Sequence, residues 1–420
     1  MTRELRDPVT FTFDGEAIQG ERGEPLAAAL VAAGQWSLAR SPKFHRPRGP
    51  SCFRAACDGC LLRVDGVPNT MSCQVDCRPN LVAESQNTLG PRNVDLLRVN
   101  DWFFPDGFNH HEFLAGVPGL NSVMQSFARR VAGLGRLPAE VQPSRNAARR
   151  HVDALVVGGG PSGLSVALEL RKQGREVEVA DDALFLGGSG MALDEPLFQS
   201  LVKDVLTSAK MGEIILHGRA SAIGIYGDDL VLASPRTTEV LDCKTLVLAP
   251  GAHDGQLAFE GNDVPGIVSA RAAGWLVRRG IRLGERVLIV VTKGGGPFGE
   301  QVEKMGAQGA TVKLIHGMPK RVSGSSRVRS VEIETDSGTV REKADVLVID
   351  TPRAPAYELC AHAGANLVHT PAGFVVTDTR IRGGVFASGE VRGVPLEPSR
   401  ILDDAHALAN LIRRDSQKRA

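Results

Sequence analysis

The stretch HVDALVVGGGPSGLSVALELRKQGREVEVADD, residues 151–182, decides the fold. It reads as a short apolar strand, a glycine turn, a helix with apolar residues at helical spacing, and a second strand that ends in an acid. The turn is a G-x-G-x-x-G motif formed by Gly158, Gly160 and Gly163. Because strand, turn, helix and acid all fall at the right offsets, the stretch indicates the dinucleotide-binding fingerprint of a parallel α/β sheet rather than a glycine turn without a ligand.

Each position of the fingerprint has a physical role. The first glycine permits a tight turn, the second lets the backbone approach a pyrophosphate, and the third lets helix and strand pack closely. The helix N-terminus offers free N–H groups and positive dipole to the phosphates, and the acid accepts hydrogen bonds from an adenosine ribose. The expected binding residues in this stretch are Gly158, Gly160, Pro161, Ser162, Gly163, Asp181 and Asp182.

Later segments are expected to complete the same site. Residues 186–190 form a second glycine turn, and residues 245–252 form a strand with a tight turn. FASGE, residues 386–390, is a strand–glycine–acid segment of the kind that closes a flavin site, with its acid on the ribityl chain and a following helix at about 399–413. These segments add Gly188, Ala220, Ala249, Gly251, Gly389 and Glu390 to the expected site.

A second glycine motif follows in VLIVVTKGGGPFG, residues 287–299, with Gly294, Gly296 and Gly299 at the same spacing. The next strand ends in His316 rather than an acid, with Lys320 and Arg321 close by. This disfavours a site in which an acid binds the two hydroxyls of an unphosphorylated ribose. Three interpretations stay open for this motif: a 2′-phosphate as in NADP, another nucleotide such as ATP, or an empty domain kept for structure.

Four of the seven cysteines lie between residues 52 and 73. Cys52, Cys57 and Cys60 have the C-x4-C-x2-C spacing of plant-type [2Fe–2S] ferredoxins, and Cys73 follows what looks like a hairpin that closes the site. Structural zinc is the main alternative, but it usually takes two C-x2-C pairs; an empty thiol set is another. Cys77 could replace Cys73, whereas the isolated Cys243 and Cys360 are expected to be small buried hydrophobic residues.

Composition sets broad limits. The chain has 420 residues, 42% of them hydrophobic, and a formal net charge of +1, which gives no argument for nucleic acid or a membrane. No apolar run reaches the roughly 18 residues needed to span a bilayer, and the N-terminus lacks the apolar core of a signal peptide. We therefore expect a cytoplasmic protein, in which clustered cysteines favour metal over disulfides.

Taken together, the motifs resemble the α subunits of heterotetrameric sarcosine oxidase and its relatives: opine oxidases, hydroxyproline and proline dehydrogenases, and hydrogen cyanide synthase. The similarity extends over nearly all of the chain, and several of the strings that carry it have no general structural reason to recur. They are FTFDG (11–15), GEPLAAALVAAG (23–34), KFHRPRG (43–49), ESQNT (84–88), RRVAGLGRLPAE (129–140), the 158–163 fingerprint, LVLAPGAHD (246–254), GNDVPGIVSARAA (261–273) and FASGE (386–390).

The sequence also departs from that family. Sarcosine oxidase α subunits continue into a long folate-binding region, which is not present here, so no folate role is expected. The cluster cysteines are like those of the cyanide synthase and opine oxidase group, but joined to the flavoprotein domain in one polypeptide; the C-terminal cysteine-rich module of those subunits is missing. Pro250 stands where Thr is usual, and Glu390 where Asp is usual.

The resemblance implies a fold and a domain order. The fold is α/β, a two-dinucleotide-binding flavoprotein of the glutathione-reductase type with an N-terminal α+β ferredoxin-like domain. The expected domains are 1–98 for the [2Fe–2S] cluster, 99–150 as a linker or interface segment, 151–263 with 351–420 for FAD, and 264–350 as the second nucleotide-binding domain. FAD is preferred over NAD at the first site because Gly389 and Glu390 are retained.

The resemblance further implies an electron-transferring subunit of an amine or amino-acid dehydrogenase, with a β flavoprotein partner that oxidises a sarcosine-, opine- or proline-type secondary amine. No catalytic residue is assigned, because the amine pocket is expected in the partner. Two other hypotheses are a stand-alone NAD(P)H:acceptor reductase and a redox-inactive scaffold. The basic loop 43–48 and the basic linker (Arg129, Arg130 and Arg136) are expected to face the partner or a phosphate, such as that of an interfacial FMN; a solvated loop is the plain alternative, and His110–His111 is read as surface or interface.

Overall fold

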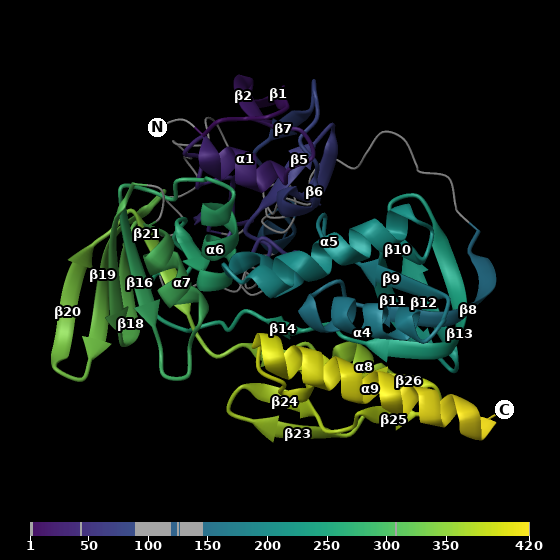
Figure 1. Cartoon of the computed structure of the whole chain (residues 1–420). Coiled ribbons are helices and arrows are strands. Elements are labelled where there is room, and N and C mark those ends of the chain that lie inside the picture. The colour runs from purple at the N-terminus through teal and green to yellow at the C-terminus, as the bar shows by residue number, and fades with distance from the viewer. Residues whose placement is uncertain are drawn as a thin grey trace. The chain divides into compact units, whose positions relative to one another are not determined.

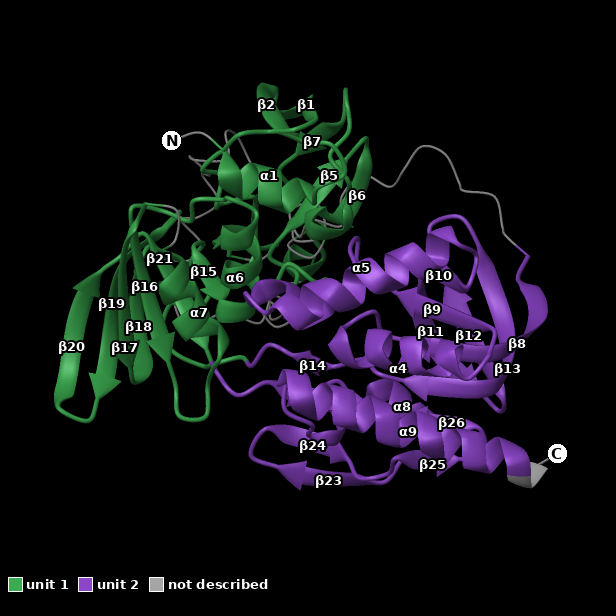
Figure 2. Ribbon diagram, viewed as in Figure 1, with its two compact units in different colours: residues 1–142, 256–350 green, residues 143–255, 351–420 purple. Residues whose placement is uncertain are grey.

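The computed structural model describes residues 3–42, 44–88, 119–123, 126, 146–306 and 309–419. Lys43, the His110–His111 pair and the linker arginines Arg129, Arg130 and Arg136 lie outside these residues. The chain divides into two compact units, residues 1–142 with 256–350 and residues 143–255 with 351–420 (Figure 2). The ferredoxin-like segment and the segment 264–350 therefore belong to one unit. Among the described residues, no helix is both long and apolar enough to cross a membrane.

The N-terminal part of the first unit is a small mixed sheet covered by one helix. Alternating apolar residues put Phe11 and Phe13 on the buried face of β1, and the Asp14–Gly15 turn returns the chain into β2. The strand order is β2-β1-β7-β5-β6, with β1 and β7 parallel. The elements are β1 (Pro8–Phe13), β2 (Glu16–Glu21), α1 (Leu26–Ala32), β3 (Ala39–Arg40), β4 (Pro47–Arg48), β5 (Leu61–Val64), β6 (Val67–Met71), η1 (Ser72–Gln74) and β7 (Val82–Glu84).

The other part of this unit is a four-stranded parallel sheet of order β15-β21-β16-β17, beside a three-stranded antiparallel sheet (Figure 1). The near-continuous apolar run of β16 is buried, as expected for a central parallel strand. The elements are β15 (Ile267–Ser269), α6 (Ala270–Arg278), β16 (Arg286–Val291), α7 (Phe298–Met305), β17 (Thr311–His316), β18 (Met318–Gly324), β19 (Val328–Thr335), β20 (Gly338–Lys343) and β21 (Val346–Asp350).

The second unit is built on a larger sheet in which β9, β8 and β13 run parallel side by side. The long strand β13 pairs with β8 along its length, while its end pairs in parallel with β26. Helix α9 covers the predicted C-terminal helix region and packs along α4 (Figure 1). This arrangement brings residues 385–390 next to the first glycine turn.

The elements of the second unit are β8 (Ala148–Val157), α4 (Pro161–Lys172), β9 (Val177–Asp181), η3 (Gly188–Ala192), α5 (Pro196–Lys210), β10 (Ile214–Gly218), β11 (Ser221–Tyr226), β12 (Asp229–Ala233), β13 (Thr238–Leu248), β14 (Ala252–His253), β22 (Ala354–Pro355), α8 (Glu358–His362), β23 (Leu367–Thr370), β24 (Gly373–Val376), β25 (Arg380–Arg382), β26 (Val385–Ala387), η5 (Gly389–Arg392) and α9 (Pro398–Arg419).

Candidate functional site

The first glycine turn lies directly at the carboxyl end of β8. Gly158 has φ +112° and its N–H donates to the Ala180 carbonyl at 2.8 Å. A Cβ on Gly158 would clash with the Ala249 carbonyl, and one on Gly163 would clash with the Gly158 carbonyl. The first and third glycines are therefore required by close backbone packing, as the fingerprint predicts.

The second glycine of this turn faces open space. Gly160 is the N-cap of α4 in extended conformation, Pro161 is its first helical residue, and no side chain of the N-cap satisfies the helix N-terminus. A Cβ added to Gly160 would meet no atom of the described chain within 4 Å. The turn at Gly187–Gly188 lies against it, because Gly187 N–H donates to the Gly159 carbonyl at 2.7 Å. Free N–H groups beside an open glycine face fit an anionic pyrophosphate.

Asp181, at the end of β9, lies inside this turn. Its carboxylate accepts the backbone N–H of Gly159 and, at 2.8 Å, that of Ala183. The Asp181 carbonyl accepts the Ala220 N–H at 2.9 Å, whereas Asp182 is exposed. A carboxylate offers about four lone-pair sites, so Asp181 can hold the turn and still accept ribose hydroxyls.

The segment 388–390 closes the other side of the site. Gly389 has φ +81°, and a Cβ there would clash with the Ser162 hydroxyl. Gly389 N–H and the Ser388 hydroxyl both donate to Asp404 Oδ2, at 3.0 and 2.7 Å. Asp404 of α9 thus fixes the segment against the first turn of α4.

Glu390 is held in a buried ion pair with Arg353. Both side chains are only 12% exposed, and the guanidinium contacts both carboxylate oxygens, with Arg353 Nη1 at 3.2 Å from Glu390 Oε2. A Cβ on Gly251 would lie 3.9 Å from that same oxygen. The structure thus gathers predicted site residues from five segments of the chain: 158–163, 181–188, Ala220, 249–251 and 389–390.

The second glycine motif is built differently. Strand β16 ends at Val291, so Thr292 and Lys293 separate it from Gly294, whereas β8 leads directly into Gly158. Gly296 faces open space, but the buried carboxylate of Asp350 accepts the Gly299 N–H at 2.5 Å. The N-terminus of α7 therefore already carries an anion from the end of β21.

The cations that follow the second motif are engaged elsewhere. His316 ends β17 and is exposed. Lys320 is ion-paired with Glu334, and Arg321 Nη2 lies 3.1 Å from Glu260 Oε1. Lys320 and Arg321 belong to the antiparallel strand β18 and are paired with these acids, so they are not oriented toward the glycine motif.

The four clustered cysteines come together as two pairs. The sulfurs of Cys52 and Cys57 lie 3.3 Å apart, and the thiols of Cys60 and Cys73 are hydrogen-bonded to each other. Among the described residues, no three or more His, Cys, Asp or Glu side chains lie close enough together to bind one metal ion. Four cysteines in two pairs match a binuclear cluster with two thiolates on each iron.

The backbone of the cysteine loop (residues 52–60) also suits a cluster. Phe53 and Ala55 adopt left-handed conformations, at φ 53° and 58°, which turn N–H groups toward the sulfurs; Arg54 N–H lies 3.5 Å from Cys52 Sγ. Alternating conformations of this kind form anion-binding concavities at many Fe–S sites. The Cys52 thiol and nearby backbone N–H groups lower the pKa of Cys57 against the opposing effect of burial, and the same contact raises the pKa of Cys52. The pair therefore favours one thiolate, the form of cysteine that binds metals.

Cys77 is separate from these pairs. Its N–H donates to the Glu24 carbonyl at 2.8 Å and its carbonyl accepts the Gly23 N–H, while its side chain packs in the apolar core under α1. Burial raises the pKa of the Cys77 thiol. Of the two candidates for the fourth position, Cys73 is the one that the structure pairs with Cys60.

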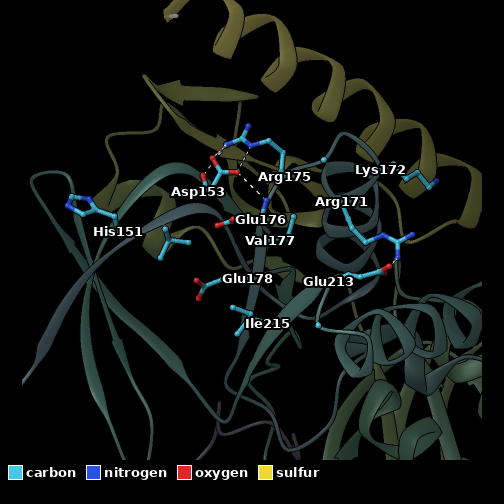
Figure 3. A pocket seen from close by; sticks show the side chains of 13 residues that line it. His151, Asp153, Arg171, Lys172, Arg175, Glu176, Val177, Glu178, Glu213 and Ile215 are labelled. Carbon is cyan, nitrogen blue, oxygen red and sulfur yellow. Dashed lines mark hydrogen bonds and ion pairs between the residues drawn. The ribbon is translucent and has the colours of Figure 1, made fainter.

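A cavity of about 610 Å³ lies toward the amino ends of β9 and β10, away from the glycine turn; Figure 3 draws the side chains that line it. It is lined by residues 151–153 in the middle of β8, by the first residues of β9 and β10, and by charged pairs such as Asp153–Arg175 and Arg171–Glu213. Ligands of open parallel sheets bind at the carboxyl ends of the strands. This amino-end cavity is therefore not the candidate site.

Two family models match the chain. Residues 6–88 match a 2Fe-2S iron-sulfur cluster binding domain, and residues 152–320 match a pyridine nucleotide-disulphide oxidoreductase. The predicted fold class, the oxidoreductase class and the two main expected cofactors, FAD and a [2Fe–2S] cluster, are thereby confirmed.

The chain has homologues among sarcosine oxidase α subunits over most of its length, which confirms the resemblance inferred from the motifs. It is 27% identical over 410 residues to sarcosine oxidase subunit alpha of Rhizobium meliloti (strain 1021), covering 86% of this chain and 41% of that protein. It is 28% identical over 333 residues to the subunit from Corynebacterium sp. (strain U-96), covering 74% and 30%. The chain thus spans less than half the length of these curated relatives.

Among solved structures, the chain is similar to L-proline dehydrogenase from P. horikoshii, with a TM-score of 0.72 and 19% sequence identity. The similarity covers 98% of this chain and 74% of that one. At this identity the comparison shows a shared fold, which includes both units and the cysteine-bearing domain.

Three side chains of these sites were missed by sequence reasoning. Arg353 and Asp404 support the segment 388–390, and Asp350 occupies the second motif. Of these three residues, only Asp350 could have been identified from the sequence. It ends an apolar strand, at a position where a small residue would leave room for a phosphate.

Proposed function

We propose that this chain is the electron-transferring flavin and iron–sulfur subunit of a multi-subunit secondary-amine dehydrogenase or oxidase in the cytoplasm. The observation that carries the proposal is the combination, in one chain similar to sarcosine oxidase α subunits, of an open dinucleotide turn and four paired cysteines. The relatives' names supply the substrate class: a sarcosine- or proline-type secondary amine. The amine pocket is assigned to a β flavoprotein partner.

When bound, the flavin supplies two-electron chemistry and the cluster divides it into single electrons. The residues of this chain bind and orient these groups. The N-terminus of α4 and Gly160 would hold the pyrophosphate, and Asp181 would accept the ribose hydroxyls. Arg353 fixes Glu390 at the far side of the site, next to Gly251.

The cluster ligands in this proposal are Cys52, Cys57, Cys60 and Cys73. Cys60→Ser removes one member of the Cys60–Cys73 pair and should abolish the low-temperature EPR signal of the reduced protein. Cys77→Ser changes a core residue outside the pairs and should leave that signal unchanged. Stoichiometric zinc in anaerobically prepared protein would contradict the assignment.

The basic loop before the cysteines is proposed to face the partner or the phosphate of an interfacial FMN. Arg48 Nη1 lies 2.9 Å from Asp263 Oδ2 and Arg46 Nη1 lies 4.0 Å from it, so Asp263 offsets part of this charge. Both arginines remain about a third exposed and can still contact an outside anion. Rim charges of this kind steer association and fix its register.

The alternative, a stand-alone NAD(P)H:acceptor reductase, is less well supported. It needs a second dinucleotide site, yet Asp350 already places a carboxylate at the N-terminus of α7. Lys320 and Arg321, which a 2′-phosphate would need, are paired with Glu334 and Glu260. We propose that the second motif binds no dinucleotide.

Co-expression with a β subunit tests the function. The isolated chain should lack amine dehydrogenase activity with sarcosine or proline and a dye acceptor, and the complex should show it. Arg46→Glu combined with Arg48→Glu should weaken assembly or FMN content, whereas Arg22→Glu, which disrupts an exposed pair with Asp7 on the same domain, should not. Amine oxidation by the isolated chain would overturn the proposal.

A further inference from the structure

The cysteine-bearing domain rests on the second α/β domain of the same unit. The Trp36 indole N–H, which is buried, donates to the Leu283 carbonyl at 3.2 Å. Ser269 N–H donates to the Ser51 carbonyl at 3.2 Å, next to the first cluster cysteine. These contacts fix the cysteine loop against the start of α6.

Arg271, in the first turn of α6, is the charged residue at this contact. Only 6% of it is exposed, and its guanidinium donates to the carbonyl of Cys52. An arginine is charged at every pH that a folded protein experiences. Its guanidinium therefore holds a positive charge within the contact, next to the backbone of a proposed cluster ligand.

We infer that Arg271 raises the reduction potential of the [2Fe–2S] cluster. The α/β domain that carries Arg271 would thus supply a positive charge that stabilises the reduced cluster. The inference rests on the proposed ligation by Cys52, Cys57, Cys60 and Cys73. Reduction adds one electron and no proton to a cluster that already carries four thiolates. A buried positive charge stabilises that added negative charge more strongly than solvent would, because the local dielectric is low. Net charge and hydrogen bonding are the main determinants of cluster potentials.

The second glycine motif (Gly294, Gly296 and Gly299) lies in the same domain as Arg271, and its geometry is consistent with a domain that supports the cluster rather than a nucleotide. The carboxylate of Asp350 holds the N-terminus of α7 and two extra residues separate the motif from β16. The domain thus keeps the dinucleotide-binding fold while its contacts with Trp36, Ser51 and Cys52 support the cluster domain.

An EPR-monitored redox titration of the full chain with dithionite and mediator dyes tests the inference. Arg271→Gln keeps hydrogen-bond donors but removes the charge, and Arg271→Met removes both. Each should shift the oxidised-to-reduced ratio at fixed potential at least tenfold toward the oxidised form, a midpoint about 59 mV lower for a one-electron couple. Arg271→Lys keeps the charge and should retain most of the wild-type potential.

Arg278→Gln is the matched control. Arg278 lies seven residues further along α6, which is two turns or about 10 Å away on the same face, so its removal should shift the midpoint by less than half as much. Midpoints of the Gln and Met variants equal to wild type would overturn the inference.

Two further outcomes are distinguishable. If the uncharged variants bind no iron, the inference is tested with Arg271→Lys alone. This variant should bind two irons per chain and keep the wild-type midpoint potential. A midpoint potential well below wild type would show that Arg271 does not act through its charge. A wild-type chain without a cluster signal would instead refute the ligand assignment itself.

Discussion

The two glycine motifs of this chain have the same letters and spacing but different surroundings. In the first, β8 leads directly into Gly158, and the neighbouring strand β13 is followed by the small residue Ala249. In the second, two residues intervene between β16 and Gly294, and the neighbouring strand β21 ends in Asp350. A phosphate at the second motif would meet a buried carboxylate, whereas at the first it would meet free N–H groups.

The difference teaches that a glycine fingerprint depends on two features outside it. One is the register between the strand end and the first glycine, which sets where the helix N-terminus points. The other is the residue that ends the adjacent parallel strand, because it lies against the turn: Ala249 packs on Gly158, and Asp350 binds Gly299. Both features are present in the sequence, and both are invisible to a pattern of glycines alone.

The largest expected effect comes from filling the two turns. Gly160→Val places a side chain in the open space in front of α4 and should lower the bound dinucleotide more than tenfold while the cluster EPR signal stays. Gly296→Val adds the same side chain to the second turn, where φ +115° also strains the backbone, and should leave the dinucleotide content of the folded protein unchanged. Equal losses in both variants, measured by acid release and chromatography, would remove the distinction between the turns.

The next effect concerns the ion pair that supports only the first site. Arg353→Leu leaves Glu390 buried without its partner and should lower the free energy of unfolding by about 3–5 kcal/mol. Urea unfolding monitored by flavin release, which reports on the unit that contains this ion pair, measures this loss. Glu390→Gln in the same background should recover part of it, since the uncompensated charge is then gone; no recovery would mean that Arg353 acts through other contacts.

The smallest effect is expected at Glu178, at the amino end of β9 and away from the first turn. Burial opposes its charge, but His217 Nε2 at 2.6 Å and Arg150 lower the pKa of Glu178 to about 2. Its stabilisation is therefore full above the unfolded pKa near 4.5 and is lost as the pH falls through about 2. About a third of the Arg150 side chain is exposed, so solvent screens its interaction with Glu178. Glu178→Gln should therefore lower the free energy of unfolding by roughly 1 kcal/mol at pH 7.

The loss of stability in Glu178→Gln should become smaller in acid. The variant should also keep its dinucleotide content, because Glu178 lies at the amino end of β9, away from the turn. Thermal unfolding of the wild type and the variant at pH 7 and pH 3 gives the comparison. A cost that grows as the pH falls would contradict the sign of the pKa shift.

Much of the fold was readable from the sequence because its signals are local. The first strand–turn–helix unit, the N-terminal hairpin and the C-terminal helix all follow from apolar periodicity and turn residues within short windows. The cysteine spacing was equally informative, because one loop carries three of the four sulfurs.

What the sequence did not reveal depends on residues that meet only in the folded chain. Arg271 and Cys52 are 219 positions apart, and Glu390 and Arg353 are 37 apart with no shared motif. A lone arginine or aspartate has many possible partners along a chain, and only the topology selects among them. The basic linker residues Arg129, Arg130 and Arg136 lie outside the described residues, and their role remains a prediction.

The most direct test of the account is a cofactor inventory of the anaerobically purified chain, combined with a titration by NADH and NADPH. We expect one FAD, two irons and two acid-labile sulfides per chain, with no saturable reduction of flavin or cluster by either nicotinamide. Two dinucleotides per chain, or rapid reduction of the cluster by NAD(P)H, would show that the second turn is a working site and would contradict the account.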